Sequence, residues 1–578
     1  MVMEYHIIFG LLLFMFVSEV NSKPPNIILI VADDLGWDDV GFHGSEIKTP
    51  NIDALAYDGI ILNNYYVQPI CTPSRSALLS GRHPIHTGLQ HGVISSTKPY
   101  GLGLENVLLP ERLKELGYKT HIVGKWHLGM VSWNYTPTYR GFDSHYGYYM
   151  GKQDYWDHTD DEQGKPCCWG LDFRDNKELV KDEFGQYSAE LYAKRANNII
   201  KEHDIEKPLF LYLPFQSVHS ANSQTPLEAP QRYIDQFKYI PNENRRIFAG
   251  MVSALDNAIQ NVTESLYRRG MLDNSVIVFT TDNGGPAGGF DVNMACNWPL
   301  RGVKSLVWEG GVRGSSFLWS PLLKKSGYVS NHMMQIFDWY PTLLSIAGYD
   351  MSSLDPSKLD GMDMWRALTI NDASPRTEML HNIDPISKQK SLRVANYKLV
   401  SGENPKYWAG WYKPGQHGVE GVDYGKEDFN GTRDEYEVLK PTDNDRKSIA
   451  IDENYFSLDK MSVKHELSEK MVDILKSLGR KVRSSDPVVV DCGPAVANRT
   501  TNCNSKKAPC LFDIENDPCE YNNLADKYPH IMRELKKRLE LYEENMITPK
   551  NKGLAPDPKG YPVYHNWTWG PWINTTAV

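Results

Sequence analysis

The stretch Asn26–Ala32 (NIILIVA), which is followed by Asp33 and Asp34, decides the fold class of this chain. An apolar run without polar alternation is typical of a strand that is buried on both faces of a parallel sheet. Ser275–Thr281 (SVIVFTT) is a second run of this kind, and it ends in Asp282-Asn283-Gly284-Gly285. We therefore expect an α/β fold in which helices flank a large sheet.

Polar side chains follow two further apolar runs. Residues 118–123 (YKTHIV) lead into a segment that contains Lys125 and His127, and residues 209–213 (LFLYL) precede His219. In open α/β sheets, ligands bind beyond the carboxyl ends of the strands. The four runs therefore predict a functional site at one edge of the sheet, built from carboxylates, an amide, a lysine and histidines.

The residue types at these strand ends indicate a divalent cation. Asp33, Asp34, Asp282 and Asn283 offer hard oxygen ligands, which suit calcium, and they lack the His and Cys content that is expected of zinc. Each feature also has an ordinary structural explanation. An acidic pair after a strand is often a helix N-cap, Asp-Asn-Gly is a common turn, and a lone histidine is more often structural than catalytic. Their joint position at strand ends favours the functional interpretation.

Cys71-Thr72-Pro73-Ser74-Arg75, continuing as Ser-Ala-Leu-Leu-Ser-Gly-Arg, is the second informative stretch. Pro73 suits the first turn of a helix, and such a helix would place Cys71 near the positive end of its dipole, where anions are favoured. The alternative is a buried or disulfide-bonded cysteine at an ordinary junction between a loop and a helix. The five-residue pattern alone does not decide between the two.

Taken together, these motifs resemble the type I sulfatase family, whose signature is Cys-X-Pro-Ser-Arg followed by Leu-X-Gly-Arg. Within that family the chain resembles the arylsulfatase B (N-acetylgalactosamine-4-sulfatase) group, including its insect members. The matching segments keep the family order: residues 123–130, 141–143, 171–175, 280–285, 297–302, 308–314, 380–385 and 569–572. The resemblance implies the sulfatase fold, which is alkaline-phosphatase-like, with a large mixed sheet flanked by helices and a smaller C-terminal domain.

The resemblance also implies a set of site residues. Cys71 would be oxidised to formylglycine by the formylglycine-generating enzyme, and the hydrated aldehyde would attack sulfate esters. One calcium ion would be bound by the oxygen ligands and the converted residue 71: Asp33, Asp34, Cys71, Asp282 and Asn283. Arg75 would hold the formylglycine, and His127 would take a proton from its diol. Contact with sulfate would come from three basic residues: Lys125, His219 and Lys304.

The implied substrate is sulfated N-acetylgalactosamine or a related sulfated glycan. Residues 220–227 form a longer insertion than vertebrate arylsulfatase B carries, Cys167 and Cys168 are adjacent, and residues 401–487 also differ from the vertebrate members. Because loops at strand ends line the entrance to a site, a glucosinolate sulfatase of a plant-feeding insect is an alternative. A catalytically inactive protein that binds sulfated glycans is another, and it would keep cysteine at position 71. A phosphatase or phosphodiesterase of the same superfamily would be expected to use a Ser or Thr nucleophile and zinc.

The length of 578 residues favours two domains. We expect a signal peptide at residues 1–22, a catalytic domain at 23–375, and a smaller C-terminal domain and tail at 376–578. The family would give the last of these an antiparallel sheet and a packed helix. Within it, residues 392–402 (LRVANYKLVSG) indicate a strand, residues 529–541 indicate a helix, and residues 403–460 indicate long loops.

Composition and targeting signals indicate a secretory protein. The net charge of −10 argues against general nucleic-acid binding, and we expect no membrane span. The apolar run within residues 7–17 and the sequons favour a lysosomal or extracellular location: Asn134, Asn261, Asn430, Asn498, Asn566 and Asn574. The eight cysteines predict the short-range bridges Cys492–Cys503 and Cys510–Cys519, with one thiol left over among Cys167, Cys168 and Cys296. The sequence does not predict the oligomeric state.

Overall fold

The computed structural model describes residues 23–162, 168–403, 405, 408–416, 466–482, 485–492 and 501–574. The expected signal peptide, the sequons at Asn430 and Asn498, and most of the loop segment expected at 403–460 lie outside the described residues. Among the described helices, none combines the length and the apolar character that a membrane crossing requires.

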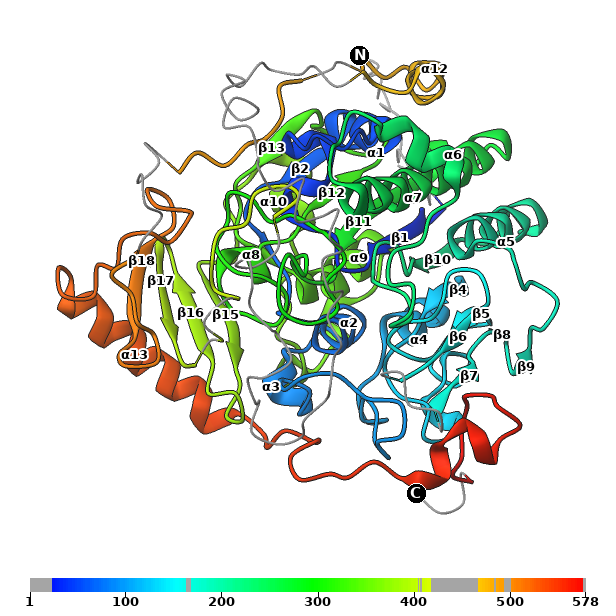
Figure 1. Ribbon diagram of the computed structural model, residues 1–578. Coiled ribbons are helices and arrows are strands. Elements are labelled where there is room, and N and C mark those ends of the chain that lie inside the picture. The colour runs from blue at the N-terminus through cyan, green and yellow to red at the C-terminus, as the bar shows by residue number, and fades with distance from the viewer. Residues whose placement is uncertain are drawn as a thin grey trace, which may run out of the picture.

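A ten-stranded mixed sheet forms the centre of the fold (Figure 1). Its strands, in sheet order, are β13 (Tyr328–Ser330), β2 (Ile60–Leu62), β12 (Ser316–Trp319), β11 (Ser275–Thr281), β1 (Asn26–Ala32), β10 (Leu209–Pro214), β4 (Lys119–Lys125), β5 (Ser144–Tyr148), β8 (Arg174–Asp175) and β9 (Glu178–Leu179). The central strands from β11 to β5 are parallel, whereas β12 and β8 pair antiparallel on either side of them. Two small sheets pair β3 (Tyr65–Tyr66) with β14 (Met334–Gln335) and β6 (Thr159–Asp160) with β7 (Gly170–Leu171).

The sequence of β1 explains its central position. Every residue of β1 is buried, and Ile28 lies in register between Leu211 of β10 and Ile277 of β11. Because neither face of the strand meets solvent, the apolar run is continuous instead of alternating. The expected bounds of β1 and β11 are both confirmed, and β10 ends one residue beyond its expected position.

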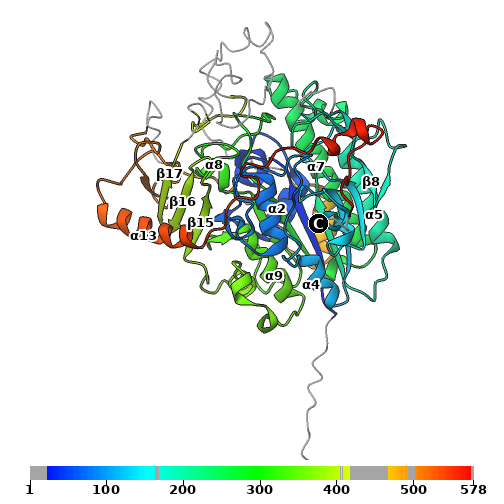
Figure 2. The ribbon, with the colours of Figure 1, turned by 90° about the horizontal axis from the view of Figure 1, so that it is seen from below.

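Two groups of helices flank the sheet, which confirms the expected fold class. Mutual contacts join α1 (Pro50–Asp58), α5 (Ser188–Glu202), α6 (Gln231–Ile234) and α7 (Glu243–Arg268) in one group, and α2 (Cys71–Ser80), α4 (Leu109–Glu115) and α9 (Trp339–Ile346) in the other (Figure 2). Further helices are α3 (Pro84–Thr87), α8 (Glu309–Val312), α10 (Trp365–Ile370) and α12 (Glu469–Ser477). The long helix α7 buries Met251, Leu255 and Ile259 at a spacing of about one turn, which is the pattern of an amphipathic helix facing a core.

The C-terminal part contains the expected antiparallel sheet and helix. The sheet consists of β15 (Glu378–Ile383), β16 (Lys390–Val394), β17 (Tyr397–Ser401) and β18 (Cys510–Asp513), and α13 (Pro529–Asn545) packs on it. The prediction of one strand at residues 392–402 was wrong, because a hairpin turn at Ala395 and Asn396 divides that segment into β16 and β17. Ala395 has φ +48°, and no Gly or Pro marks the turn in the sequence.

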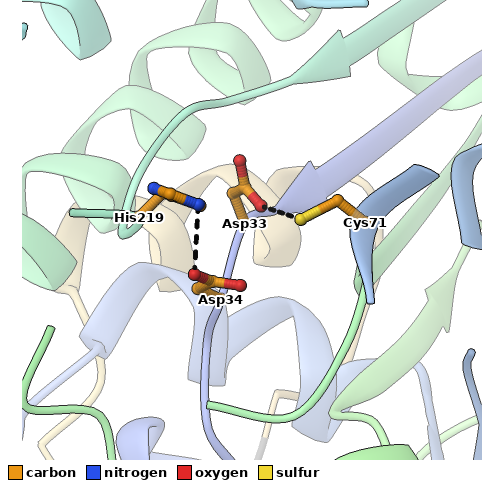
Figure 3. A group of neighbouring side chains, drawn as sticks. All are labelled: Asp33, Asp34, Cys71 and His219. Carbon is orange, nitrogen blue, oxygen red and sulfur yellow. Dashed lines mark hydrogen bonds and ion pairs between the residues drawn. The ribbon is translucent and has the colours of Figure 1, made fainter. Parts of the chain in front are cut away.

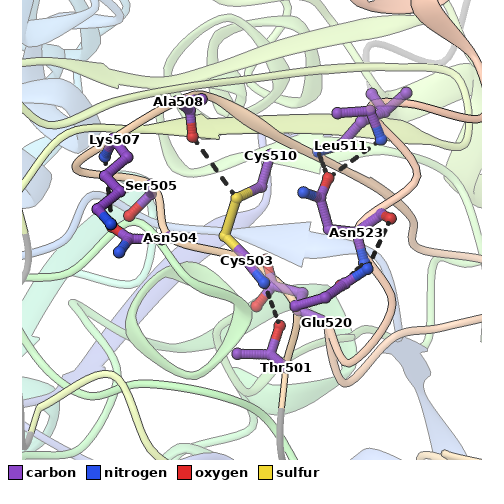
Figure 4. Close-up of a disulfide and its surroundings, with 12 residues drawn as sticks. Thr501, Cys503, Asn504, Ser505, Lys507, Ala508, Cys510, Leu511, Glu520 and Asn523 are labelled. Carbon is purple, nitrogen blue, oxygen red and sulfur yellow. Dashed lines mark hydrogen bonds between the residues drawn. A yellow bond between two sulfur atoms is a disulfide. The ribbon is translucent and has the colours of Figure 1, made fainter.

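The disulfide prediction was also wrong. The structure joins Cys492 to Cys519 and Cys503 to Cys510, as Figure 4 shows for the second pair. The extended strand β18 begins at Cys510 and carries the chain away from it, so that Cys519 reaches the cluster of Trp37, Leu300 and Cys492. Sequence spacing therefore misidentified the partners. Cys168 is disulfide-bonded and Cys296 is free, in agreement with the expectation of one thiol left over.

A buried ion network joins the C-terminal sheet to the main body. The ammonium of Lys398 in β17 lies 2.8 Å from Glu309 of α8 and 2.9 Å from Glu520, and all three side chains are fully buried. The second carboxylate oxygen of Glu309 accepts a hydrogen bond of 2.7 Å from the hydroxyl of Tyr66. Burial raises the pKa of Glu520 to about 7, even though Lys398 opposes the rise. The two carboxylates therefore share this ammonium group, and Glu309 also lies 3.8 Å from the buried guanidinium of Arg313.

Replacing Lys398 by methionine should destabilise the protein by about 3–5 kcal/mol, because it removes the cation that two buried carboxylates share. The loss should shrink as the pH falls, since protonation removes the uncompensated charges. Urea unfolding at neutral and acidic pH measures both effects. Lys388→Met is the matched control, because Lys388 pairs with Glu403 on the exposed surface. Equal losses for the two variants would show that the buried network does not hold the sheet in place.

Candidate active site

The segments that follow β1, β4, β10 and β11 meet the N-terminus of α2 at one edge of the large sheet. Figure 3 shows Asp33 and Asp34 after β1, Cys71 at the start of α2, and His219 after β10. One ligand atom of each of these residues lies within 4.8 Å of the others. The predicted convergence of the strand ends is therefore what the structure shows.

Cys71 is the first residue of α2, and Pro73 lies in the first turn, as the sequence predicted. The Cys71 sulfur lies 3.7 Å from Oδ1 of Asp33, and the residue is 2% exposed. Burial raises the pKa of the Cys71 thiol well above its usual value, although Lys125 and Lys304 oppose the rise. The unmodified side chain would therefore remain a neutral thiol, which is a poor nucleophile.

Three buried carboxylates are each paired with a different cation. Lys125 at the end of β4 contacts Asp33 at 2.5 Å, and Lys304 contacts Asp34 at 2.8 Å. Arg75, one turn after Cys71 in α2, donates two hydrogen bonds of 3.0 and 2.8 Å to Oδ2 of Asp282. The terminal nitrogen that donates the 2.8 Å hydrogen bond also lies 3.4 Å from Oδ1 of Asp33. The arginine therefore links the ends of β1 and β11.

The carboxylates of Asp33 and Asp282 differ in pKa. Burial and the charge of Asp282 raise the pKa of Asp33 to about 6, against the opposing effects of Lys125 and Arg75. Although burial raises its pKa as well, Asp282 keeps a pKa of about 2 because Arg75 and Lys125 lower it. A further cation close to Asp33 would relieve this repulsion.

The oxygen atoms of this cluster fit a hard divalent cation. The side-chain amide of Asn283 donates a 2.6 Å hydrogen bond to Asp34, and its own Oδ1 is buried with no hydrogen-bond partner among the described residues. Among the described residues, Oδ1 of Asp282 accepts a long hydrogen bond of 3.3 Å from the backbone nitrogen of Asp34. Carboxylate and amide oxygens are the ligands that calcium prefers. The donor set is therefore chemically suited to calcium.

The two histidines are buried and neutral. Nδ1 of His219 lies 2.7 Å from the carbonyl of Ser220, and its Nε2 lies 3.2 Å from the ammonium of Lys304. Burial and Lys304 lower the pKa of His219 to about 4. His127 places Nε2 3.2 Å from the carbonyl of Ile94, and burial and Lys125 hold its pKa well below the usual value. Its Nδ1 has no hydrogen-bond partner in the described part of the chain, so it remains able to accept a proton.

The structure adds Asp291, which the sequence reasoning missed. Its carboxylate lies 3.1 Å from the Lys304 ammonium and 3.6 Å from Nε2 of His219. Although desolvation opposes it, the Lys304 ammonium lowers the pKa of this partly exposed carboxylate. Asp291 belongs to a glycine-rich loop with no regular periodicity, and it has a positive φ of +54°. A sequence pattern would not have located it.

Comparisons with known proteins agree with this geometry. The sulfatase family profile matches residues 25–349. Arylsulfatase J of Mus musculus is 37% identical over 96% of this chain and 81% of its own length. N-acetylgalactosamine-6-sulfatase of Homo sapiens is 30% identical over 59% of this chain and 65% of its own length.

Among solved structures, Ps i-CgsB in complex with k-i-k-neocarrahexaose superposes with a TM-score of 0.58 at 31% identity. The match covers 66% of the present chain and 84% of the Ps i-CgsB chain. With a profile match over more than half of its residues, the chain belongs to the sulfatase family, and it is a sulfuric ester hydrolase of the arylsulfatase type.

Proposed function

We propose that this protein hydrolyses sulfate esters of N-acetylgalactosamine or related sulfated glycans, through a formylglycine made from Cys71. The observation that carries the proposal is the position of Cys71, which begins α2 and faces Asp33 among buried cations. The Cys71 sulfur stands in for the oxygen of the modified residue. Relatives named N-acetylgalactosamine-6-sulfatase support the glycan class.

The residues around Cys71 are suited to hold a sulfate group. The N-terminus of α2 favours an anion at this position, and the ammonium groups of Lys125 and Lys304 converge on it from β4 and a loop. Both lysines are fixed by buried carboxylates, so they need little reorganisation when charge develops on sulfate. Arg75 would hold the modified side chain from one turn along the same helix.

The histidines would manage the protons. The departing alcohol needs a proton. The hydrogen bond between Nζ of Lys304 and Nε2 of His219 holds a proton that this pair would donate to it. His127 lies beside residue 72, because the Thr72 hydroxyl donates a 3.1 Å hydrogen bond to the His127 carbonyl. The neutral imidazole of His127 can accept the proton that the formylglycine diol loses when sulfate is released.

Calcium would be bound by the oxygen ligands and the modified residue: Asp33, Asp34, Asp282, Asn283 and residue 71. When bound, it would offset the negative charge of a sulfate oxygen. We also propose that residues 23–375 form the catalytic domain, since every residue of the site lies there, and that residues 376–578 form a smaller domain and tail. We also propose that the protein passes through the secretory pathway to a lysosomal or extracellular location.

The modification has a direct test. In protein from a secretory host, the tryptic peptide of residues 49–75 should have the mass expected for an aldehyde in place of the thiol of Cys71. Cys71→Ser should abolish multiple turnover of 4-nitrophenyl sulfate, because a serine hydroxyl cannot form a diol. Cys296→Ser is the control at the second free cysteine and should stay active. An unmodified Cys71 in active protein, or steady turnover by Cys71→Ser, would overturn the proposal.

Calcium binding has a readout besides activity. After removal of metal with a chelator, calcium at about 100 times its Kd should stabilise the protein against urea by about 2.7 kcal/mol. Asn283→Ala should reduce this gain because it removes one oxygen ligand. The control Asn545→Ala changes an exposed amide at the end of α13 and should keep the full gain. Stoichiometric zinc in the purified protein, with no stabilisation by calcium, would contradict the assignment.

A further inference from the structure

The site contains one carboxylate that is open to solvent. The side chain of Asp291 is 17% exposed, whereas those of Asp34, Lys304 and His219 are 0–4% exposed. Asp291 therefore lies on the open side of the site, where the rest of a substrate would extend from its sulfate group. A negative charge at that place weakens the attraction for sulfate and calls for a reason.

Charge compensation of Lys304 does not supply that reason. Asp34 already lies 2.8 Å from the Lys304 ammonium and is fully buried, whereas Asp291 is slightly farther away at 3.1 Å. Neutralising one ammonium requires only one of these carboxylates. The second is left with capacity to accept further hydrogen bonds, because an ionised carboxylate has about four lone-pair sites.

The loop of Asp291 is held rigidly. The fully buried side chain of Asn293 donates hydrogen bonds of 2.7 Å to the carbonyl of Val218 and 3.3 Å to that of Asp34. Asp291 itself adopts φ +54°, a conformation that Asp tolerates better than most residues. A Cβ at Gly289 would lie 2.9 Å from the Trp408 ring, so this ring packs directly on the loop backbone.

Aromatic rings border Asp291. The rings of Phe290 and Trp408 have centroids 5.7 Å apart, and the Lys304 ammonium lies 5.2 Å from the Phe290 centroid. Both aromatic residues are partly exposed. Rings beside a few fixed polar groups are what a binding site for a small organic ligand requires. On a sugar, the C–H faces suit the rings, and the hydroxyl groups can donate to the carboxylate.

We infer that Asp291, with Phe290 and Trp408, forms the subsite for the sugar that carries the sulfate ester. The carboxylate accepts a hydrogen bond from a free hydroxyl or amide N–H of that sugar. It also selects against a second anionic group at the same place. This inference rests on the proposed function and defines its substrate class as sugars with one sulfate ester beside an uncharged hydrogen-bond donor.

Aryl sulfates that differ only in charge test this selection. The probes are phenyl sulfates with a 4-aminomethyl, 4-hydroxymethyl or 4-carboxymethyl group, whose leaving groups have similar acidity. The wild-type protein should prefer the cationic over the anionic probe in kcat/KM. Asp291→Asn should reduce that preference by about tenfold, the effect expected for charges about 6 Å apart in a partly solvated site. The same variant should improve the relative use of N-acetylgalactosamine 4,6-disulfate over the 4-sulfate.

Two further variants serve as controls. Asp291→Glu keeps the charge and should retain most of the preference for the cationic probe. Asp350→Asn removes the same charge from an exposed helix cap and should leave the preference at the wild-type value. If Asp291→Asn lowers kcat/KM equally for all probes, Asp291 only supports Lys304, and the inference fails while the proposed function stands. If the wild-type protein hydrolyses none of the probes, the inference and the proposed function both fail.

Discussion

The site depends on buried ion pairs that cross the sheet. Lys125 from β4 reaches Asp33 past the intervening strand β10, and Arg75 from α2 reaches the ends of both β1 and β11. Breaking one pair in such a place leaves an uncompensated charge without water, which costs several kcal/mol. The strand ends are therefore held in one arrangement, and the lysines cannot turn toward solvent. The groups that would bind sulfate are therefore rigid because their ion pairs are buried away from water.

The same burial decides what chemistry residue 71 can perform. A thiolate is disfavoured there, because burial outweighs the nearby ammonium groups in setting the pKa of Cys71. In a dry site, however, fixed cations act on a developing negative charge far more strongly than they would in water. The surroundings of Cys71 thus suit the binding of an anion and do not suit cysteine nucleophilic catalysis. This is the physical reason to expect the residue to act in a modified form.

The sequence predicted those parts of the site that follow from continuous apolar strands. Asp33 and Asp282 could be placed because β1 and β11 are buried on both faces, and their ends are clear in the sequence. Lys304 was reached only through the family resemblance, and Asp291 was missed, since both lie on loops. The disulfide pairs failed for a related reason, because the direction of β18, not the spacing of the cysteines, decides which sulfur atoms meet.

The loop after His219 shows why substrate choice and catalysis are hard to separate. The backbone nitrogen of Ser223 and the side-chain amide of Asn222 bind the Thr159–Asp161 segment at 3.0 and 3.1 Å. Tyr155, close to that segment, donates a 2.9 Å hydrogen bond to the carbonyl of His219. The loop and the histidine therefore share one set of anchors, so a change in loop length would also move His219. Asp291 is tied to the same histidine, because Asn293 of its loop donates a hydrogen bond to the carbonyl of Val218, the residue before His219, and the Asp291 carboxylate lies 3.6 Å from Nε2 of His219. Sugar choice is therefore best probed by an isosteric change such as Asp291→Asn, which keeps the loop and alters only the charge.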